Sequence, residues 1–273
     1  MNVRKMTAVV LATTSILGQA FAGDKIVCEG SSTVGPLAKA FAEYYMEANP
    51  TTAITVSESG SGNGAKAIVE GTCDVADMSR NMKNKEYKSA VDKGVMPCPH
   101  VIALDGLAVV VHKSNPVKGL TLAQLKDIYL GKITNWSSLG GTNRKIIVIT
   151  RDTNSGTFET FAKLVMNKEV IASGVEVVGS NGQARSRVTT TKDAIAYVGL
   201  GFMEGLKPVA INGTLPSADT VRSGAYAIAR PLFMYTNGYP KIGSELHKFM
   251  SIYLSEDGQE IIEEIGFVPV TNY

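Results

Sequence analysis

The stretch Lys25–Asn49, KIVCEGSSTVGPLAKAFAEYYMEAN, contains a strand, a loop rich in glycine and hydroxyl groups, and a helix in direct succession. Lys25–Glu29 is a short apolar run of the kind that forms a buried strand. From Pro36 to Asn49 the apolar side chains recur at helical spacing, and proline is favoured in a first helical turn. The loop between them, Gly30–Gly35, therefore presents free backbone N–H groups at a helix N-terminus.

The same succession occurs twice more in the chain. Ser59–Gly64 follows an alternating strand at Thr52–Ser57, and it leads into a helix that Gly71 ends. Arg151–Thr157 follows an apolar strand and leads into a helix that extends to Met166. Such termini bind oxyanions through orphan N–H groups and the helix dipole. One loop of this kind is an ordinary helix cap, but three in one chain favour an anion site, to which Arg151 adds a planar cation.

Strands and helices alternate along the whole chain, which is typical of an α/β fold with largely parallel sheets. In open sheets of this kind, ligands bind beyond the C-terminal ends of the strands, where these loops lie. Two strands broken at Asp105-Gly106 are predicted at Val101–Leu104 and Leu107–His112. The other predicted elements are strands at Lys145–Thr150, Ala194–Val198, Pro208–Ile211 and Pro231–Thr236, and helices after Thr121, at Ser244–Leu254 and at Asp257–Ile265.

The N-terminus has the three parts of a secretory signal peptide, which we expect to be cleaved near Ala22. These parts are the basic residues Arg4 and Lys5, the apolar run Thr7–Leu17 and the small-x-small sequence Ala20-Phe21-Ala22. The 273 residues carry a formal charge of +2, from 27 basic and 25 acidic side chains. Cleavage would leave a neutral, soluble protein, so a global basic field for nucleic acid is excluded.

Several other chemistries lack their sequence patterns. The chain has no GxxxxGK[ST] phosphate loop, no GxGxxG dinucleotide motif and no GxSxG nucleophile elbow. Its three histidines lack partners at metal-ligand spacing, and CxxC does not occur. The loop serines have no obvious nearby base, so the sequence indicates neither an enzyme nor a cofactor.

Three cysteines remain after signal-peptide removal, and two of them can pair in an oxidising compartment. Cys28 lies inside an apparent buried strand, so a disulfide between Cys73 and Cys98 is the favoured expectation. Three inert buried thiols are the alternative.

Taken in order, the loops resemble the phosphate-binding proteins that serve ABC phosphate importers, and the resemblance covers essentially the whole mature chain. The residues that carry it are Gly30–Val34, Gly60–Gly64, Ser79-Arg80, Asp105–Val111, Gly131–Trp136, Arg151–Thr157 and Gly266–Val270.

The resemblance implies a type II periplasmic-binding-protein fold with two domains, each a mostly parallel sheet flanked by helices. Domain one would comprise residues 23–110 plus 233–273, and domain two residues 111–232. The crossing segments would be Val109–Lys113 and Pro231–Thr236, with the ligand in the cleft between the domains.

The resemblance also implies a set of phosphate-binding residues. At Arg80, well-studied members have an aspartate that accepts the proton of hydrogen phosphate and so rejects sulfate. Here Arg80 would be a second cation, and Asp105 becomes the candidate proton acceptor, with Glu58 and Asp77 as weaker ones. The full expected set is Ser32, Thr33, Val34, Ser61, Ser79, Arg80, Asp105, Arg151, Ser155, Gly156 and Thr157.

The function implied is that of a periplasmic, monomeric, non-enzymatic receptor. It would capture inorganic phosphate and deliver it to an ABC permease in the inner membrane, with no metal, cofactor or nucleic acid involved. Three alternatives stay open at this point: a receptor for sulfate, a secreted phosphoester hydrolase that uses a loop serine, and an adhesin or matrix protein on the same scaffold.

Overall fold

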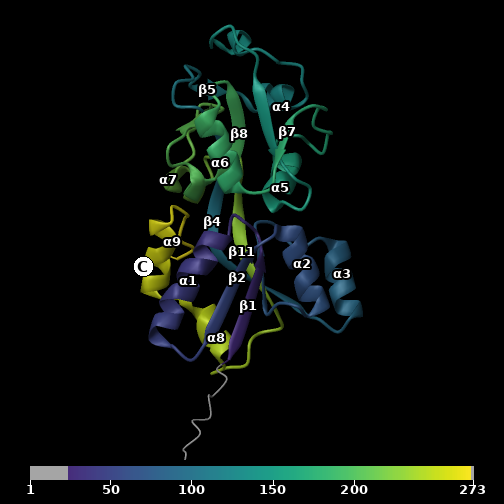
Figure 1. The fold of residues 1–273 in the computed structure, drawn as a ribbon, viewed down its shortest axis with the longest axis vertical. Helices are drawn as coiled ribbons and strands as arrows, with labels where there is room; N and C mark the ends of the chain where they lie inside the picture. Colours follow the sequence, from purple (N-terminus) through teal and green to yellow (C-terminus); the bar gives the residue numbers. More distant parts are fainter. Residues whose placement is uncertain (1–23, 272–273) are drawn as a thin grey trace, which may run out of the picture.

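The structure, a computed structural model, describes residues 24–271 and has two lobes that lie end to end along its long axis (Figure 1). The predicted signal peptide and its cleavage site lie outside the described residues. The lower lobe contains β1 (Lys25–Gly30), α1 (Gly35–Ala48), β2 (Ala53–Glu58), α2 (Ser61–Glu70), β3 (Val75–Met78), α3 (Asn84–Asp92), α8 (Glu245–Ser251), η3 (Ile252–Leu254) and α9 (Glu256–Glu264).

The upper lobe is formed by one uninterrupted segment of the chain. It contains β5 (Gly119–Leu120), α4 (Leu122–Tyr129), η1 (Trp136–Leu139), β6 (Ile147–Arg151), α5 (Gly156–Leu164), β7 (Glu176–Val178), α6 (Asn181–Thr190), β8 (Ala194–Gly199), η2 (Leu200–Phe202), β9 (Lys207–Pro208), β10 (Ala210–Ile211) and α7 (Ala218–Arg222). The strands β4 (Pro97–Val111) and β11 (Ala229–Asn237) connect the two lobes (Figure 1).

One sheet runs through both lobes in the order β2-β1-β3-β11-β4-β8-β6-β7, with β9 beside β4. The strand β4 exchanges partners along its length: Pro97–Gly106 pairs with β11, and Leu107–Val111 pairs with β8. The predicted break at Asp105-Gly106 is therefore wrong as an interruption of the strand, although the exchange of partners falls at that position. The predicted domain limits stay a prediction.

Local sequence signals account for several element ends. The Thr121 hydroxyl accepts the backbone N–H of Gln124 and so caps α4, as predicted. The helix α2 ends at Gly71, whose φ of 67° lies in the left-handed region. The predicted strand Pro208–Ile211 is wrong as a single strand: its residues belong to β9, which pairs with β4, and to β10, which pairs with β5 in a separate two-stranded sheet.

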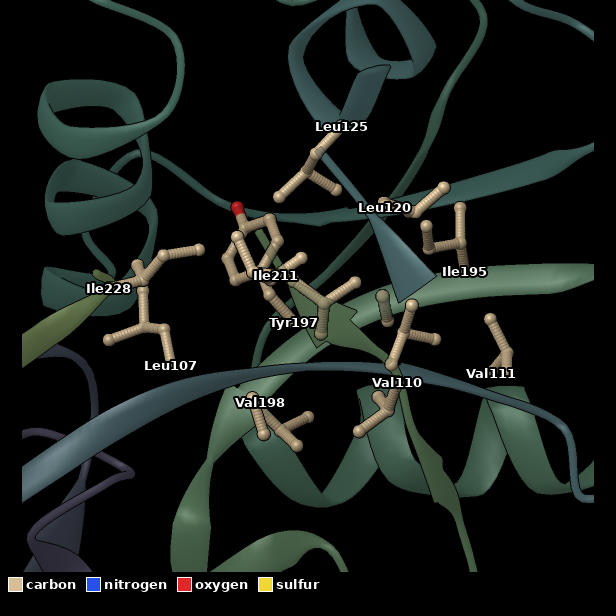
Figure 2. Close-up of a cluster of buried hydrophobic side chains, with 14 of the residues drawn as sticks. Leu107, Val110, Val111, Leu120, Leu125, Ile195, Tyr197, Val198, Ile211 and Ile228 are labelled. Carbon is tan, nitrogen blue, oxygen red and sulfur yellow. The ribbon is translucent and has the colours of Figure 1, made fainter. Parts of the chain in front are cut away.

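Apolar side chains fill each lobe separately. Figure 2 shows the upper core, where side chains of β4 and β8 pack against residues from β5, α4 and β10. In the lower lobe, one cluster lies between the sheet and α1, α8 and α9, and another lies between the sheet and α2 and α3. These clusters place the loops at the C-terminal ends of β1, β2 and β6 where the lobes meet.

The expected disulfide is wrong, because all three cysteines are free. Cys73 precedes β3 and Cys98 lies on β4, and β11 lies between these two strands in the sheet. Two strand spacings amount to about 10 Å, whereas a disulfide needs Cα atoms closer than about 7 Å. Cys28 and Cys73 are buried, and Cys98 is half-buried.

Asp77 on β3 is fully buried, and neither of its carboxyl oxygens has a hydrogen-bond partner among the described residues. Burial raises the pKa of Asp77 well above its ordinary value. Because the folded protein holds this proton more tightly than the unfolded chain does, protonation of Asp77 adds to the free energy of unfolding. This contribution is complete at low pH, below the pKa of an aspartate in the unfolded chain. It is lost as the pH rises through the folded-state pKa.

We therefore expect Asp77→Asn to lose less stability than the wild type between pH 5 and pH 8, as measured by urea unfolding. The control is Asp92→Asn, since Asp92 lies exposed on α3 and pairs with Lys88. An Asp77→Asn variant with the same pH dependence as the wild type would mean that Asp77 is ionised in the folded protein.

Candidate functional site

The three predicted loops meet at the contact between the lobes. The hydroxyl of Thr33, after β1, lies 3.0 Å from that of Thr157, in the first turn of α5. At the start of α2, the Gly62 N–H donates to the Asn154 carbonyl at 2.9 Å. The loops of the lower lobe therefore contact the third loop directly.

A cluster of hydroxyl groups is buried at this contact. Ser61 Oγ lies 3.3 Å from Ser79 Oγ and accepts the Ser79 N–H at 3.0 Å. Ser32, Thr33 and Thr157 lie in the same contact and are likewise almost fully buried. Burial of so many polar groups costs free energy unless each finds a partner, so the cluster is typical of a ligand site rather than a core.

Arg151 supplies a buried positive charge at the end of β6. Its Nη2 donates to Ser32 Oγ at 3.2 Å and to the Gly179 carbonyl at 2.8 Å, and its Nε donates to the Val178 carbonyl. Burial lowers the pKa of Arg151 to about 10, so the guanidinium stays charged at neutral pH. Its Nη1 is buried without a partner among the described residues, which indicates a donor that serves a bound acceptor.

Arg230, on β11, is a second buried cation that the sequence did not reveal. Its Nη2 donates to Thr157 Oγ1 at 3.0 Å and to Thr33 Oγ1 at 3.3 Å, so it contacts both lobes. Its Nη1 donates to the Ser79 carbonyl at 3.1 Å. The feature of the sequence that could have indicated Arg230 is its position directly before the apolar run that we predicted as a strand.

Asp105, on β4, is the partner of Arg230. Its Oδ2 accepts from Arg230 Nε at 3.0 Å and Nη2 at 2.8 Å, and its Oδ1 accepts the Leu200 N–H at 2.9 Å. Burial raises the pKa of Asp105 and lowers that of Arg230, and the ion pair opposes both shifts. Asp105 therefore lies beside the hydroxyl cluster and orients its second cation.

Asn181, the first residue of α6, also joins the cluster unpredicted. Its Nδ2 donates to Thr33 Oγ1 at 2.9 Å, and its Oδ1 accepts the Gly199 N–H at 3.3 Å. The Ser180 hydroxyl caps the helix. Ser180-Asn181-Gly182 thus repeats the small polar pattern that drew attention to the other loops.

Arg80 is engaged elsewhere. Its Nη1 and Nη2 donate to Glu86, and its Nε donates to Glu159. Its expected role as the second cation of the site stays a prediction, and the geometry favours Arg230 for that place. Of the weaker acceptor candidates, Glu58 pairs with Lys39, and the Asp77 carboxyl group forms no hydrogen bond with either arginine of the cluster.

The other expected residues shape the loops. Val34 is fully buried, and its N–H donates to Ser31 Oγ at 3.4 Å. Ser155 caps α5 by accepting the Phe158 N–H. A Cβ atom added at Gly156 would overlap the hydroxyls of Ser61 and Ser79, so only glycine permits this approach.

The site therefore combines two guanidinium groups, several hydroxyls, one amide and one carboxylate, which suits a tetrahedral oxyanion. Within residues 24–271, no group of His, Cys, Asp or Glu side chains is placed to hold a metal ion. Among these residues, no carboxylate or imidazole accepts a hydrogen bond from a hydroxyl of the cluster.

Comparison with known proteins gives consistent matches. A family model described as a PBP superfamily domain matches residues 17–257. The phosphate-binding protein PstS of Staphylococcus epidermidis (strain RP62A) is 35% identical over 88% of this chain and 77% of its own length. The PstS protein of Bacillus subtilis is 32% identical over 94% of this chain and 85% of its own length.

A solved structure points to the same group of proteins. A substrate-binding protein with bound phosphate from Clostridium perfringens superposes with a TM-score of 0.84 and is 31% identical. The match covers 91% of this chain and 100% of that one.

The close approach at Gly156 allows a test of the contact between the lobes. We expect Gly156→Ala to weaken the binding of inorganic phosphate at least about tenfold, because the added methyl group forces the loops apart. The measurement is isothermal titration calorimetry, with the melting temperature as a check on folding.

The matched control is Gly182→Ala, also at a helix start in the upper lobe, where an added Cβ lies 3.8 Å from Ser180 Oγ. This variant should bind as the wild type does. Equal affinities for Gly156→Ala and the wild type would remove the tight contact from the binding mechanism.

Proposed function

The chain belongs to the PstS-like phosphate-binding proteins of the PBP superfamily, and on that premise we propose that it captures inorganic phosphate between its lobes for delivery to an ABC importer. The observation that carries this proposal is the pair of buried guanidinium groups, Arg151 and Arg230, within one hydroxyl cluster. Arg151 keeps an unpartnered buried donor there. A multiply charged oxyanion is the ligand that compensates such a surplus of buried positive charge and donors.

Closure follows from the position of the donors. Ser32 and Thr33 belong to the lower lobe, whereas Arg151, Thr157 and Asn181 belong to the upper lobe. An anion held by both sets binds the closed arrangement more tightly than the open one, so phosphate favours closure. Phosphate release to a permease then requires that the lobes separate.

We propose that the contacts to phosphate come from the expected residues, with Arg230 and Asn181 added and without Arg80. The remaining members are Ser32, Thr33, Val34, Ser61, Ser79, Asp105, Arg151, Ser155, Gly156 and Thr157. Asp105 is the proposed acceptor for the proton of hydrogen phosphate, because it is the carboxylate that joins the hydroxyl cluster through Arg230.

The proposed setting is the periplasm, with signal-peptide cleavage near Ala22, a monomeric protein and a permease in the inner membrane as partner. No helix among the described residues is long and apolar enough to cross a membrane. We propose that the protein has no enzymatic activity, since the hydroxyls of the cluster contact guanidinium, amide and hydroxyl groups rather than a base.

The experiment that tests this function is calorimetry on protein stripped of bound anion, with phosphate titrated in the absence and presence of excess sulfate. Saturable 1:1 binding that sulfate does not reduce is the expected result. Loss of the signal in sulfate would identify a receptor for tetrahedral oxyanions in general, and the absence of binding to either anion would contradict the proposal.

Arg151→Ala should weaken phosphate binding by at least about 2 kcal/mol, because it removes a charge-assisted contact from a desolvated site. Arg144→Ala is the matched control, since Arg144 lies in the same lobe, is exposed and pairs with Asp193. Calorimetry of both variants should separate the local contact from the general loss of one positive charge. Similar affinities for the two variants would refute the role of Arg151.

Asp105→Asn should reduce the discrimination between phosphate and sulfate. The carboxylate favours a protonated anion and repels an unprotonated one, whereas the amide can donate to either. The measurement is the ratio of the two dissociation constants. An unchanged ratio would assign the proton acceptor to another group.

A further inference from the structure

Arg80 and Lys83, from the lower lobe, both form ion pairs with Glu159 of the upper lobe. Arg80 Nε lies 2.9 Å from Glu159 Oε1, and Lys83 Nζ lies 2.8 Å from Glu159 Oε2. The side chain of Arg80 is 7% exposed and that of Glu159 is 19% exposed. Each oxygen of one carboxylate is thus held by a cation from the opposite lobe. The pair with Arg80 is largely shielded from water, whereas the Lys83 side chain is 39% exposed.

Arg80 is fixed in place from within its own lobe. Its Nη1 donates to Glu86 Oε2 at 2.8 Å and its Nη2 donates to Glu86 Oε1 at 2.9 Å, in a bidentate pair. Glu86 also accepts the Lys83 N–H at the start of α3. Because the guanidinium is held independently of the upper lobe, little side-chain entropy is lost when it meets Glu159.

These ion pairs lie next to the anion site. Arg80 directly follows Ser79, and Glu159 lies on α5 two residues after Thr157. A cavity of about 280 Å³ adjoins them, and both lobes and the connecting strand β11 line it, through Arg80, Lys83, Glu159, Lys163, Arg230 and Pro231 among others. Separation of the lobes must break the contacts of Glu159, while the pair between Arg80 and Glu86 can persist.

We propose that Arg80, Lys83 and Glu159 form an interlobe latch that prolongs closure and slows the release of the bound anion. This inference rests on the proposed function and adds positioning residues that need not touch the anion. The latch contacts exist only when the lobes are together, so their free energy favours the closed state alone. The burial of the pair between Arg80 and Glu159 makes it stronger than exposed ion pairs, which contribute little, and the more exposed Lys83 adds a weaker contact.

Simple electrostatics predicts the opposite effect of the key substitution. Glu159 is a negative charge near an anion site, so its neutralisation by itself would strengthen anion binding. Loss of a latch would instead weaken binding through faster release. The direction of the change therefore separates the two explanations.

The test compares Glu159→Gln with Glu86→Gln. Both substitutions remove one negative charge beside Arg80, but only Glu159 contacts the other lobe. Stopped-flow release of inorganic phosphate and calorimetry should show about tenfold faster release and weaker affinity for Glu159→Gln. Glu86→Gln should have a clearly smaller effect, because Arg80 keeps its contact with Glu159 and the glutamine oxygen can still accept from the guanidinium. Thermal unfolding should show that both variants are folded.

Tighter binding by Glu159→Gln, or equal changes in the two variants, would overturn the latch. Wild-type protein that bound no anion would contradict the proposed function instead. In that case, small-angle X-ray scattering would test the latch without a ligand. A larger radius of gyration for Glu159→Gln than for the wild type and Glu86→Gln would support it. Equal radii would overturn it.

Discussion

The buried ion pair between Arg230 and Asp105 is the interaction on which the rest of the arrangement depends. Its side chains are 4% and 0% exposed, and the removal of two such charges from water costs several kcal/mol per ion. The pair is tolerated because Arg230 also donates to Thr33, Thr157 and the Ser79 carbonyl. It lies where β4 and β11 connect the lobes. One interaction therefore joins the two strands and holds the Arg230 guanidinium in the anion site.

Much of the fold could be predicted because its apolar residues follow a clear periodicity. The predicted helix at Pro36–Asn49 matches α1, whose apolar side chains form a buried stripe. The helices α3 and α6 were not predicted, because neither has that stripe. The helix α3 buries only Ala90, and α6 buries only Asn181, Ala184 and Val188. Four-residue β3 has the acidic Asp77 in a strand buried along its whole length, which masks its apolar pattern.

The candidate site could be predicted where its loops have a distinctive composition. Ser32, Thr33, Ser61 and Thr157 were expected from glycine and hydroxyl clusters at helix starts, and the structure brings them together. The place of Arg230 depends on the pairing of β11 with β4, and no local pattern encodes such a long-range register. The ion pair of Arg80 with Glu159 depends in the same way on α5 of the other lobe. The resemblance suggested a ligand contact for Arg80, and it could not reveal this partner.

The continuity of the upper lobe has a consequence for the order of folding. Its core draws almost wholly on one segment between Leu107 and Ile228, so most of its contacts can form as soon as that segment is available. The lower lobe cannot complete its sheet until β11 arrives between β3 and β4, from a part of the chain synthesised much later. Sheet pairing over such separations is slow. The lower lobe should therefore be the last part of a newly made chain to become resistant to proteases.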